Sequence, residues 1–176
     1  MIISLEEAKK IDSTISESAL DGLETMVRKL TNNNFQLRNF RVGFLELYGS
    51  TITCQNGRMD IFFKGDTIEI NGSMYNDGLY TIVSSSESGI EIDSTFIPES
   101  NSNAIATKVS YPADIVEGIK KLISYDLKMA NKIGVKSESI SRWSVTYYDV
   151  TSTESIEGYP TTLLGFLKKY RKLRWS

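Results

Sequence analysis

The sequence predicts an α+β fold: a small helical bundle of about four helices that carries an inserted small antiparallel β-sheet or barrel. Two observations support this prediction. Apolar residues recur with the helical period of 3.6 before residue 40 and again after residue 110, whereas between them they alternate with the period of two that is typical of strands. We therefore expect a helical domain made of residues 1–40 and 110–176, and an inserted β module of residues 41–109.

Two helices are expected before the β module. Ser4 and Glu7 have the spacing of a capping box, which predicts a short helix at the N-terminus. A second helix is predicted from about Ser18 to Leu30, because four apolar residues recur there at spacings of three and four. The polar stretch at residues 31–34 should end this helix, since short polar side chains compete for backbone hydrogen bonds.

The stretch from Lys64 to Ser84 is the clearest local signal of the β module. Ile68 and Ile70 alternate with polar residues, and the β-branched and aromatic residues of Leu79–Val83 predict a returning strand. Asn76, Asp77 and Gly78 lie between them and tolerate the positive φ of a tight turn. This order predicts a β-hairpin.

Alternation predicts further strands on both sides of this hairpin. It covers residues 45–54, 59–63, 90–93 and 105–109, with a turn at 55–57 and a polar loop at 98–103. Five to seven strands joined by short turns are typical of a small antiparallel sheet or barrel.

The C-terminal part begins with the longest predicted helix. Pro112 and Asp114 favour its first turn, and Gly134 is its predicted C-cap. Residues 139–149 then alternate and predict a short strand or an extended arm. A last helix, which carries four apolar residues on one side, is expected after Gly158-Tyr159-Pro160.

Composition narrows the possible chemistry. The chain has 176 residues, a formal net charge of −2, a single cysteine, Cys54, and no histidine. An internal disulfide and histidine-based catalysis or metal binding are therefore excluded. We predict no catalytic, cofactor-binding or metal-binding residue. The N-terminus lacks the features of a secretory signal and no apolar run reaches the ~18 residues of a membrane span, so a cytosolic origin without membrane contact is expected.

The charges are unevenly distributed. Eight acidic and two basic residues lie between Arg58 and Glu99, a net charge of −6, whereas Lys168–Arg174 contains five basic residues and no acidic one. With Tyr170 and Trp175 interleaved, the basic run could bind nucleic acid, dock on an acidic protein surface, or complement the negative end of a helix. These alternatives remain open.

Carboxylates of the β module allow one further reading. Glu91 and Asp93 share a strand face at a spacing of about 7 Å, which could serve a glycoside hydrolase, although a solvated sheet face explains them as well. Asn76 and Asp77 are expected to be turn residues instead of calcium ligands.

The order of the C-terminal segments resembles that of a known family. PADIVEGIKKLISYDLKMANKIG is followed by VKSESISRWSVTYYDV, a polar loop and YPTTLLGFLKKYRKLRW, and the N-terminal SLEEAKKI precedes a second helix. This arrangement resembles the head-tail connector (adaptor) proteins of tailed bacteriophages and related prophages. GDTIEINGSMYNDGLYTIV is similar to small β modules of phage head-completion proteins. The compact members of the connector family are nearly all helical, so the large β module is a departure.

The resemblance implies a structural, non-enzymatic virion protein without a cofactor. Such proteins form a ring, typically of twelve copies, below the portal protein, and DNA passes through the ring without sequence-specific binding. The other face receives a stopper or tail-completion protein. The expected location is the head-tail interface of the virion, and the host cytoplasm during assembly. The alternative function is a nucleic-acid-binding module that uses the basic C-terminal tail.

The resemblance also gives candidate contact residues. The portal-facing candidates are Leu167, Lys168, Tyr170, Arg171, Arg174 and Trp175. The contact candidates in the β module are Asn76, Asp77, Glu91 and Asp93.

Overall fold

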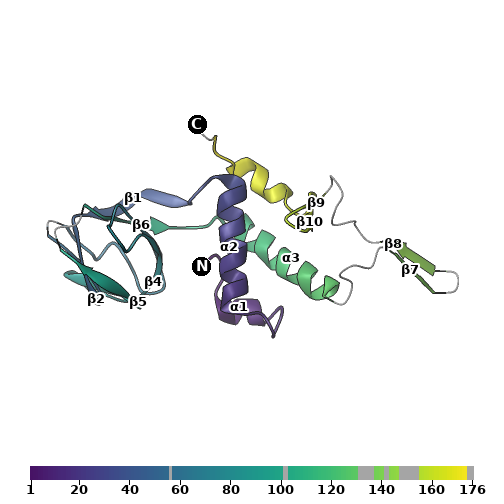
Figure 1. The fold of residues 1–176 in the computed structure, drawn as a ribbon, viewed down its shortest axis with the longest axis horizontal. Coiled ribbons are helices and arrows are strands. Elements are labelled where there is room, and N and C mark those ends of the chain that lie inside the picture. Colours follow the sequence, from purple (N-terminus) through teal and green to yellow (C-terminus); the bar gives the residue numbers. More distant parts are fainter. Residues whose placement is uncertain (56, 101–102, 131–136, 141–142, 147–154, 174–176) are drawn as a thin grey trace. The chain divides into compact units, whose positions relative to one another are not determined.

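A six-stranded antiparallel sheet is the largest element of the structure (Figure 1). The computed structural model describes residues 1–55, 57–100, 103–130, 137–140, 143–146 and 155–173. The strands of the sheet are β1 (Gln36–Gly43), β2 (Leu45–Cys54), β3 (Thr67–Asn71), β4 (Gly78–Ser85), β5 (Gly89–Glu99) and β6 (Ile105–Val109). Their order across the sheet is β1-β6-β3-β4-β5-β2, so the first two strands of the chain lie at its two edges.

The chain divides into two compact units. The first, called here the sheet unit, is continuous and consists of Asn34–Ser110. The second, called here the helical unit, combines Met1–Asn33 with Tyr111–Ser176.

The predicted fold class, a small helical bundle with an inserted small sheet, is wrong. Strand makes up 35% of the chain and helix 29%, and the curled six-stranded sheet dominates as a half-barrel. One reason is that two of the expected helices are short: α1 (Leu5–Lys9) has five residues, and the C-terminal helix is a six-residue 3-10 helix, η1 (Gly165–Tyr170). Of the helices in the described ranges, only α2 (Glu17–Thr31) and α3 (Ala113–Met129) are long enough to bury an extended face.

Curling of the sheet follows from irregularities in its pairing. The register of β2 against β5 shifts on both sides of Gly49, which has a φ of +58°. A further shift lies between Ile82 and Ser84 of β4. Such bulges bend a strand and increase its twist. The two edge strands are consecutive in the chain and are joined by Phe44 alone, whose φ is +56°.

The sheet unit has a hydrophobic core made of its own residues. It consists of Val42, Leu45, Leu47, Ile52, Met59, Phe62, Ile68, Ile70, Ile82, Ile90, Ile92, Phe96, Ala104 and Ala106. The predicted alternation is confirmed in β5, where Ile90 and Ile92 are buried and Glu91 and Asp93 are exposed. A core of this size stabilises the sheet unit without help from the helices, since each buried large apolar side chain contributes roughly 1.5–3 kcal/mol.

The predicted hairpin is confirmed, but its turn has a different construction. β3 and β4 pair in register from Thr67 opposite Thr81 to Ile70 opposite Gly78. The residue with a positive φ is Gly72, at +81°, and not Asn76 or Asp77. The connection is therefore a longer loop, residues 72–77.

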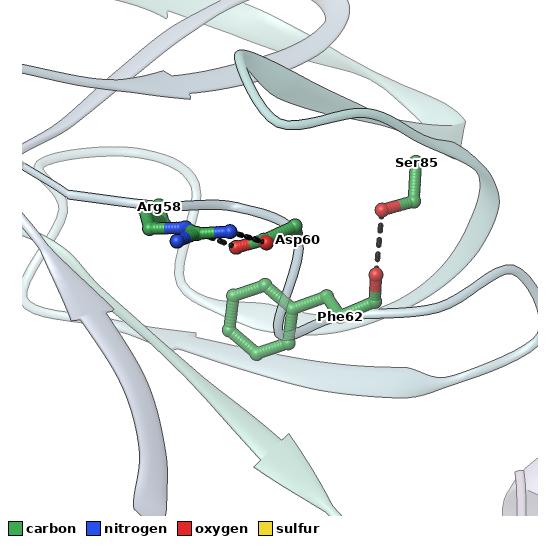
Figure 2. Close-up of polar contacts among 4 residues, drawn as sticks. All are labelled: Arg58, Asp60, Phe62 and Ser85. Atoms are coloured by element: carbon green, nitrogen blue, oxygen red, sulfur yellow. Dashed lines mark hydrogen bonds and ion pairs between the residues drawn. The ribbon is translucent and has the colours of Figure 1, made fainter.

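The strand predicted at residues 59–63 is wrong, because this segment is made of turns and bends and does not pair with a strand. Met59 and Phe62 are fully buried, whereas Phe63 is 62% exposed. Figure 2 shows how local polar contacts hold the segment. Arg58 Nε donates to Asp60 Oδ1 over 3.0 Å, and the Ser85 hydroxyl donates to the Phe62 carbonyl over 2.5 Å. The alternation of Met59, Ile61 and Phe63, which predicted the strand, does not mark one buried face: Met59 is buried, Ile61 is half-buried and Phe63 is exposed.

The N-terminal helices match their predicted signals. The Ser4 hydroxyl accepts from the Glu7 amide at the start of α1, and Ser16 caps α2 in the same way at Ala19. α2 ends at the predicted polar stretch, where Asn32 adopts a left-handed conformation. Its buried face includes the predicted Leu20, Leu23 and Val27.

The C-terminal segments differ more from prediction. β7 (Ser137–Ile140) pairs with β8 (Trp143–Thr146) as a hairpin where a single strand or arm was expected. A second short pair, β9 (Ser155–Ile156) and β10 (Tyr159–Pro160), precedes η1. Asn56 of a predicted turn, residues 101–102 of the predicted polar loop, the predicted cap Gly134, and residues 147–149 of the predicted arm lie outside the described residues.

Candidate functional site

The C-terminal segment is the first candidate site, and its apolar side chains fix it to the helical unit. Leu164 and Leu167 are buried, with 6% and 3% of their surfaces exposed. Gly118 of α3 faces the ring of Phe166, because a Cβ at that position would lie 2.3 Å from the ring. The glycine therefore allows η1 to approach α3 closely.

Backbone hydrogen bonds tie the same segment to the C-terminal end of α2. The Lys172 amide donates to the Thr31 carbonyl over 2.8 Å. Asn33 Nδ2 donates to the carbonyl of Tyr170 over 3.2 Å, and Asn32 Nδ2 donates to that of Leu173 over 3.1 Å. The asparagine-rich stretch, which the sequence marks only as a helix stop, therefore also anchors the last described residues.

A polar contact joins η1 to the first turn of α3. The Tyr170 hydroxyl donates to Asp114 Oδ1 over 2.5 Å, and Lys169 forms an ion pair with the same carboxylate. The hydrogen bond from Lys169 and then that from Tyr170 hold the pKa of Asp114 below its usual range. The same contact raises the pKa of Lys169 and of Tyr170. One cation of the basic run is thus used within the helical unit.

The other basic side chains of the run that the structure describes are exposed. Lys168, Arg171 and Lys172 all point to solvent, next to Leu173, which is 78% exposed. Of the predicted portal-facing residues, Lys168 and Arg171 are exposed, Tyr170 is partly buried and Leu167 lies in the core. Arg174 and Trp175 lie outside the described residues.

Asn76 of the sheet unit is a buried anchor. Only 5% of the surface of this residue is exposed. Asn76 Nδ2 donates to the Ile97 carbonyl over 2.9 Å, and its Oδ1 accepts from the Ile97 amide over 2.9 Å. Nδ2 also donates to Glu99 Oε2 over 3.1 Å. The side chain therefore fixes the 72–77 loop to the end of β5.

The other predicted residues of the sheet unit make hydrogen bonds to their neighbours. Asp77 Oδ1 accepts from the amide and the hydroxyl of Ser73, both over 2.8 Å. Although burial opposes the shift, these bonds lower the pKa of Asp77. Glu91 accepts from the Ser84 hydroxyl over 2.8 Å, and Asp93 accepts from the Thr81 amide over 3.2 Å. Both carboxylates thus bridge β5 to β4.

The anchored 72–77 loop displays apolar side chains that sequence patterns did not single out. Met74 is 73% exposed, Tyr75 is 65% exposed, and Ile97 on the neighbouring β5 is 54% exposed. The Met74 amide donates to Glu99 Oε1 over 3.0 Å, which further restrains the loop. In the sequence, the glycines and polar residues of the loop indicate a turn. They do not show which apolar side chains of the loop are exposed, so no sequence pattern could have identified this surface.

A pocket of about 520 Å³ lies in the helical unit, at the N-terminal end of α2. Ile15, Leu23, Met26 and Ile123 are among its apolar lining residues, and Asp12, Asp126, Glu157 and Tyr159 are its ionisable ones. The Tyr159 hydroxyl donates to Asp126 Oδ2 over 2.6 Å. Burial, and then the charge of Asp12, raise the pKa of Asp126, while the bond from Tyr159 opposes the shift. Sequence reasoning missed this pocket, because its acids come from three separate segments.

Comparisons with known proteins do not add a family. No protein-family model matches the sequence, and no curated protein matches it. Among the described residues, no group of three or more Cys, Asp or Glu side chains is arranged to hold a metal ion. No helix within the described ranges is both long and apolar enough to cross a membrane.

Proposed function

We propose that this chain is a subunit of the head-tail connector of a tailed bacteriophage or prophage. In this role, copies form a ring below the portal, DNA passes through the ring, and a stopper or tail-completion protein binds the other face. The observation that carries the proposal is the C-terminal segment, which is fixed at both ends of η1 yet presents Lys168, Arg171, Lys172 and Leu173 to solvent. A fixed segment with an exposed apolar residue among cations is suited to docking on an acidic protein surface.

Helix-end electrostatics accounts less well for these cations. η1 is a six-residue 3-10 helix, and its macrodipole is correspondingly small. Lys169 pairs with a carboxylate, that of Asp114, instead of binding the helix end. The three exposed cations therefore support a partner-facing role, and the portal is the partner that the resemblance to connectors implies.

The 72–77 loop is the proposed second contact surface of the subunit. Met74 and Tyr75 are large and exposed, and the Asn76 contacts hold them in place before any partner binds. Methionine and aromatic residues are enriched in interface cores, and a pre-ordered loop lowers the entropy lost on binding. We assign this surface to the stopper or tail-completion protein.

A nucleic-acid-binding module remains the alternative candidate. The exposed cations favour it, because each neutralised phosphate releases counterions. Stacking on bases receives less support, since Tyr170 is partly buried and its hydroxyl is bonded to Asp114. The two candidates differ in their expected partner and can be separated with one set of variants.

The test uses the full chain with the purified portal protein from the same phage genome. Size-exclusion chromatography with light scattering and negative-stain microscopy should show a complex in which the ring sits on the portal. Reversal of the exposed cations, in Lys168→Glu/Arg171→Glu/Lys172→Glu, should weaken portal binding by roughly tenfold or more. The matched control reverses three exposed lysines elsewhere, in Lys9→Glu/Lys64→Glu/Lys121→Glu, and should retain the complex.

Binding of a DNA duplex across a salt titration completes the test. A connector should bind duplex weakly, and the triple reversal at η1 should change this binding no more than the control does. Failure to bind the portal, together with strong salt-dependent DNA binding that only the η1 variant loses, would overturn the proposal in favour of the nucleic-acid-binding module.

A further inference from the structure

The pocket and the basic C-terminal segment of the helical unit have complementary chemistry. Asp12, Asp126 and Glu157 line the pocket together with apolar side chains, so it suits a cationic group with an apolar body. The C-terminal segment offers this combination, with Arg171, Lys172 and the exposed Leu173 in sequence. Opposite charge on two surfaces sets register and orientation when the surfaces meet.

The two surfaces lie at opposite ends of the same helices. The C-terminal segment is bonded to Thr31 and Asn32 at the C-terminal end of α2, whereas the pocket surrounds Ser16 at its beginning. Figure 1 shows η1 beside the last turn of α2 and α1 near its first turn. Fifteen helical residues span about 22 Å. Along α3, Asp114 bonds to Tyr170 while Asp126 lines the pocket, a separation of about 18 Å.

The described cations of the segment therefore do not reach the acidic residues of their own pocket. Arg171 and Lys172 are held beside the C-terminal end of α2, and the separation of roughly 18–22 Å exceeds the length of an arginine or lysine side chain. A contact between the segment and the pocket must join two copies of the chain. Because the two surfaces differ, such a contact is heterologous and repeats from copy to copy, which builds a closed ring or an open filament.

We propose that the acidic pocket of one copy receives the basic C-terminal segment of the next copy. Arg171 and Lys172 lie against Asp12, Asp126 and Glu157, and the apolar side chains of the segment cover the pocket floor. This inference rests on the proposed function in that it uses the segment assigned there to the portal. The contact between copies therefore forms in solution and is released when the portal is added, because the portal and the neighbouring copy compete for one segment.

Burial of Asp126 supports this occupant. Its pKa is raised first by burial and further by the charge of Asp12, so ionisation of Asp126 is unfavourable. A guanidinium or ammonium group between the two carboxylates would relieve their repulsion. Among the described residues that line the pocket, none is a lysine or an arginine.

The experiment is a complementation of two full-length variants, one with a neutral segment and one with a charge-reversed pocket. The donor variant is Arg171→Ala/Lys172→Ala, which keeps the pocket, and the acceptor variant is Asp12→Lys/Glu157→Lys, which keeps the segment. Sedimentation velocity at increasing concentration should show self-association of the wild type, with a Kd of micromolar order or weaker, and monomers for each variant alone. An equimolar mixture of the two variants should give a one-to-one dimer that does not grow, because each pair has one intact contact.

Matched reversals in the sheet unit control for net charge. Lys64→Glu replaces an exposed lysine and Glu87→Lys an exposed glutamate, and both variants should associate like the wild type. Circular dichroism of every variant checks folding. A second readout is fluorescence anisotropy of a labelled peptide of residues 168–176, which should bind the wild type and the donor variant at least tenfold more tightly than the acceptor variant.

Several outcomes would overturn the inference. These are a monomeric wild type over the whole range, a variant mixture that stays monomeric, self-association by folded variants of either class, or equal peptide binding by all proteins. Equal loss of self-association in the control variants would also overturn the inference, since that result would assign the effect to net charge. Portal binding is measured separately, so loss of the portal complex with intact complementation rejects the connector role while retaining the contact between copies.

Discussion

Asn76 shows how one buried amide can organise a surface loop. Replacement by alanine leaves the Ile97 amide and carbonyl without their side-chain partner in a partly buried setting. Each unsatisfied buried group costs about 1–3 kcal/mol, so Asn76→Ala should lower the free energy of unfolding by roughly 2–3 kcal/mol. Urea denaturation of the full chain measures the change. Asn103→Ala removes an exposed amide and should change stability by no more than about 0.5 kcal/mol; equal effects of the two variants would contradict the assigned role.

Asp126 predicts a specific dependence of stability on pH. Its pKa in the folded protein is raised above the ordinary value of 3.8, chiefly by burial. The folded state therefore holds the proton more tightly than the unfolded state. The resulting stabilisation is complete below 3.8 and is lost as the pH rises through the raised pKa.

Two variants test this behaviour. Asp126→Asn should remove the loss of stability on the rise from low pH, whereas Tyr159→Phe should move the loss to higher pH, because the hydrogen bond from Tyr159 lowers the pKa of Asp126. Urea denaturation at a series of pH values from below 4 to 7 gives the profiles. Identical profiles for the wild type and Asp126→Asn would show that another group controls this pH range.

At the scale of elements, η1 is held by a close approach to α3 that only glycine permits. Gly118→Ala would gain up to about 1 kcal/mol in helix propensity, but the new methyl group meets the Phe166 ring. Overpacking typically costs about 1–3 kcal/mol, so we expect a net loss of stability. In the background of Phe166→Leu, the same substitution should be neutral or stabilising.

A double-mutant cycle measures this coupling. The expected coupling free energy between positions 118 and 166 is about 1 kcal/mol or more. The double variant should lose less stability than the two single losses added together. Additive effects would mean that Phe166 moves aside without cost. Because η1 carries the cations that are proposed to bind the portal, each single variant, Gly118→Ala or Phe166→Leu, should also weaken portal binding.

Several elements could be predicted because their signals are local. Ser4 identifies α1 through its cap, and the alternation of Ile90 and Ile92 identifies β5 and its buried face. Met59, Ile61 and Phe63 gave a false strand signal, because the segment forms turns that bury Met59 and Phe62 and leave Phe63 exposed. The pocket and the role of Asn76 depend on residues far apart in the sequence, and a single sequence carries no signal for such contacts.

At the scale of the whole molecule, the sheet unit should fold alone. Residues 34–110 contain a complete hydrophobic core, and the Ser110 amide donates to the Phe35 carbonyl over 3.0 Å, which joins the two ends of the unit. We expect the isolated fragment to unfold in urea with one cooperative transition and to show dispersed amide signals in an NMR spectrum. Residues 1–33 alone should remain largely unfolded, since α2 has its buried partners after residue 110. A molten sheet fragment would contradict the independence of its core.

The division of the helical unit between the two ends of the chain has a consequence during synthesis. α2 leaves the ribosome with Leu20, Leu23 and Val27 uncovered, and about 80 residues separate it from α3. At roughly 5–20 residues per second, this delay lasts about 4–16 s, ample time for the sheet unit to fold first. The apolar stripe of α2 thus forms a binding site for chaperones on the nascent chain, and slow translation of the middle of the gene would lengthen its exposure.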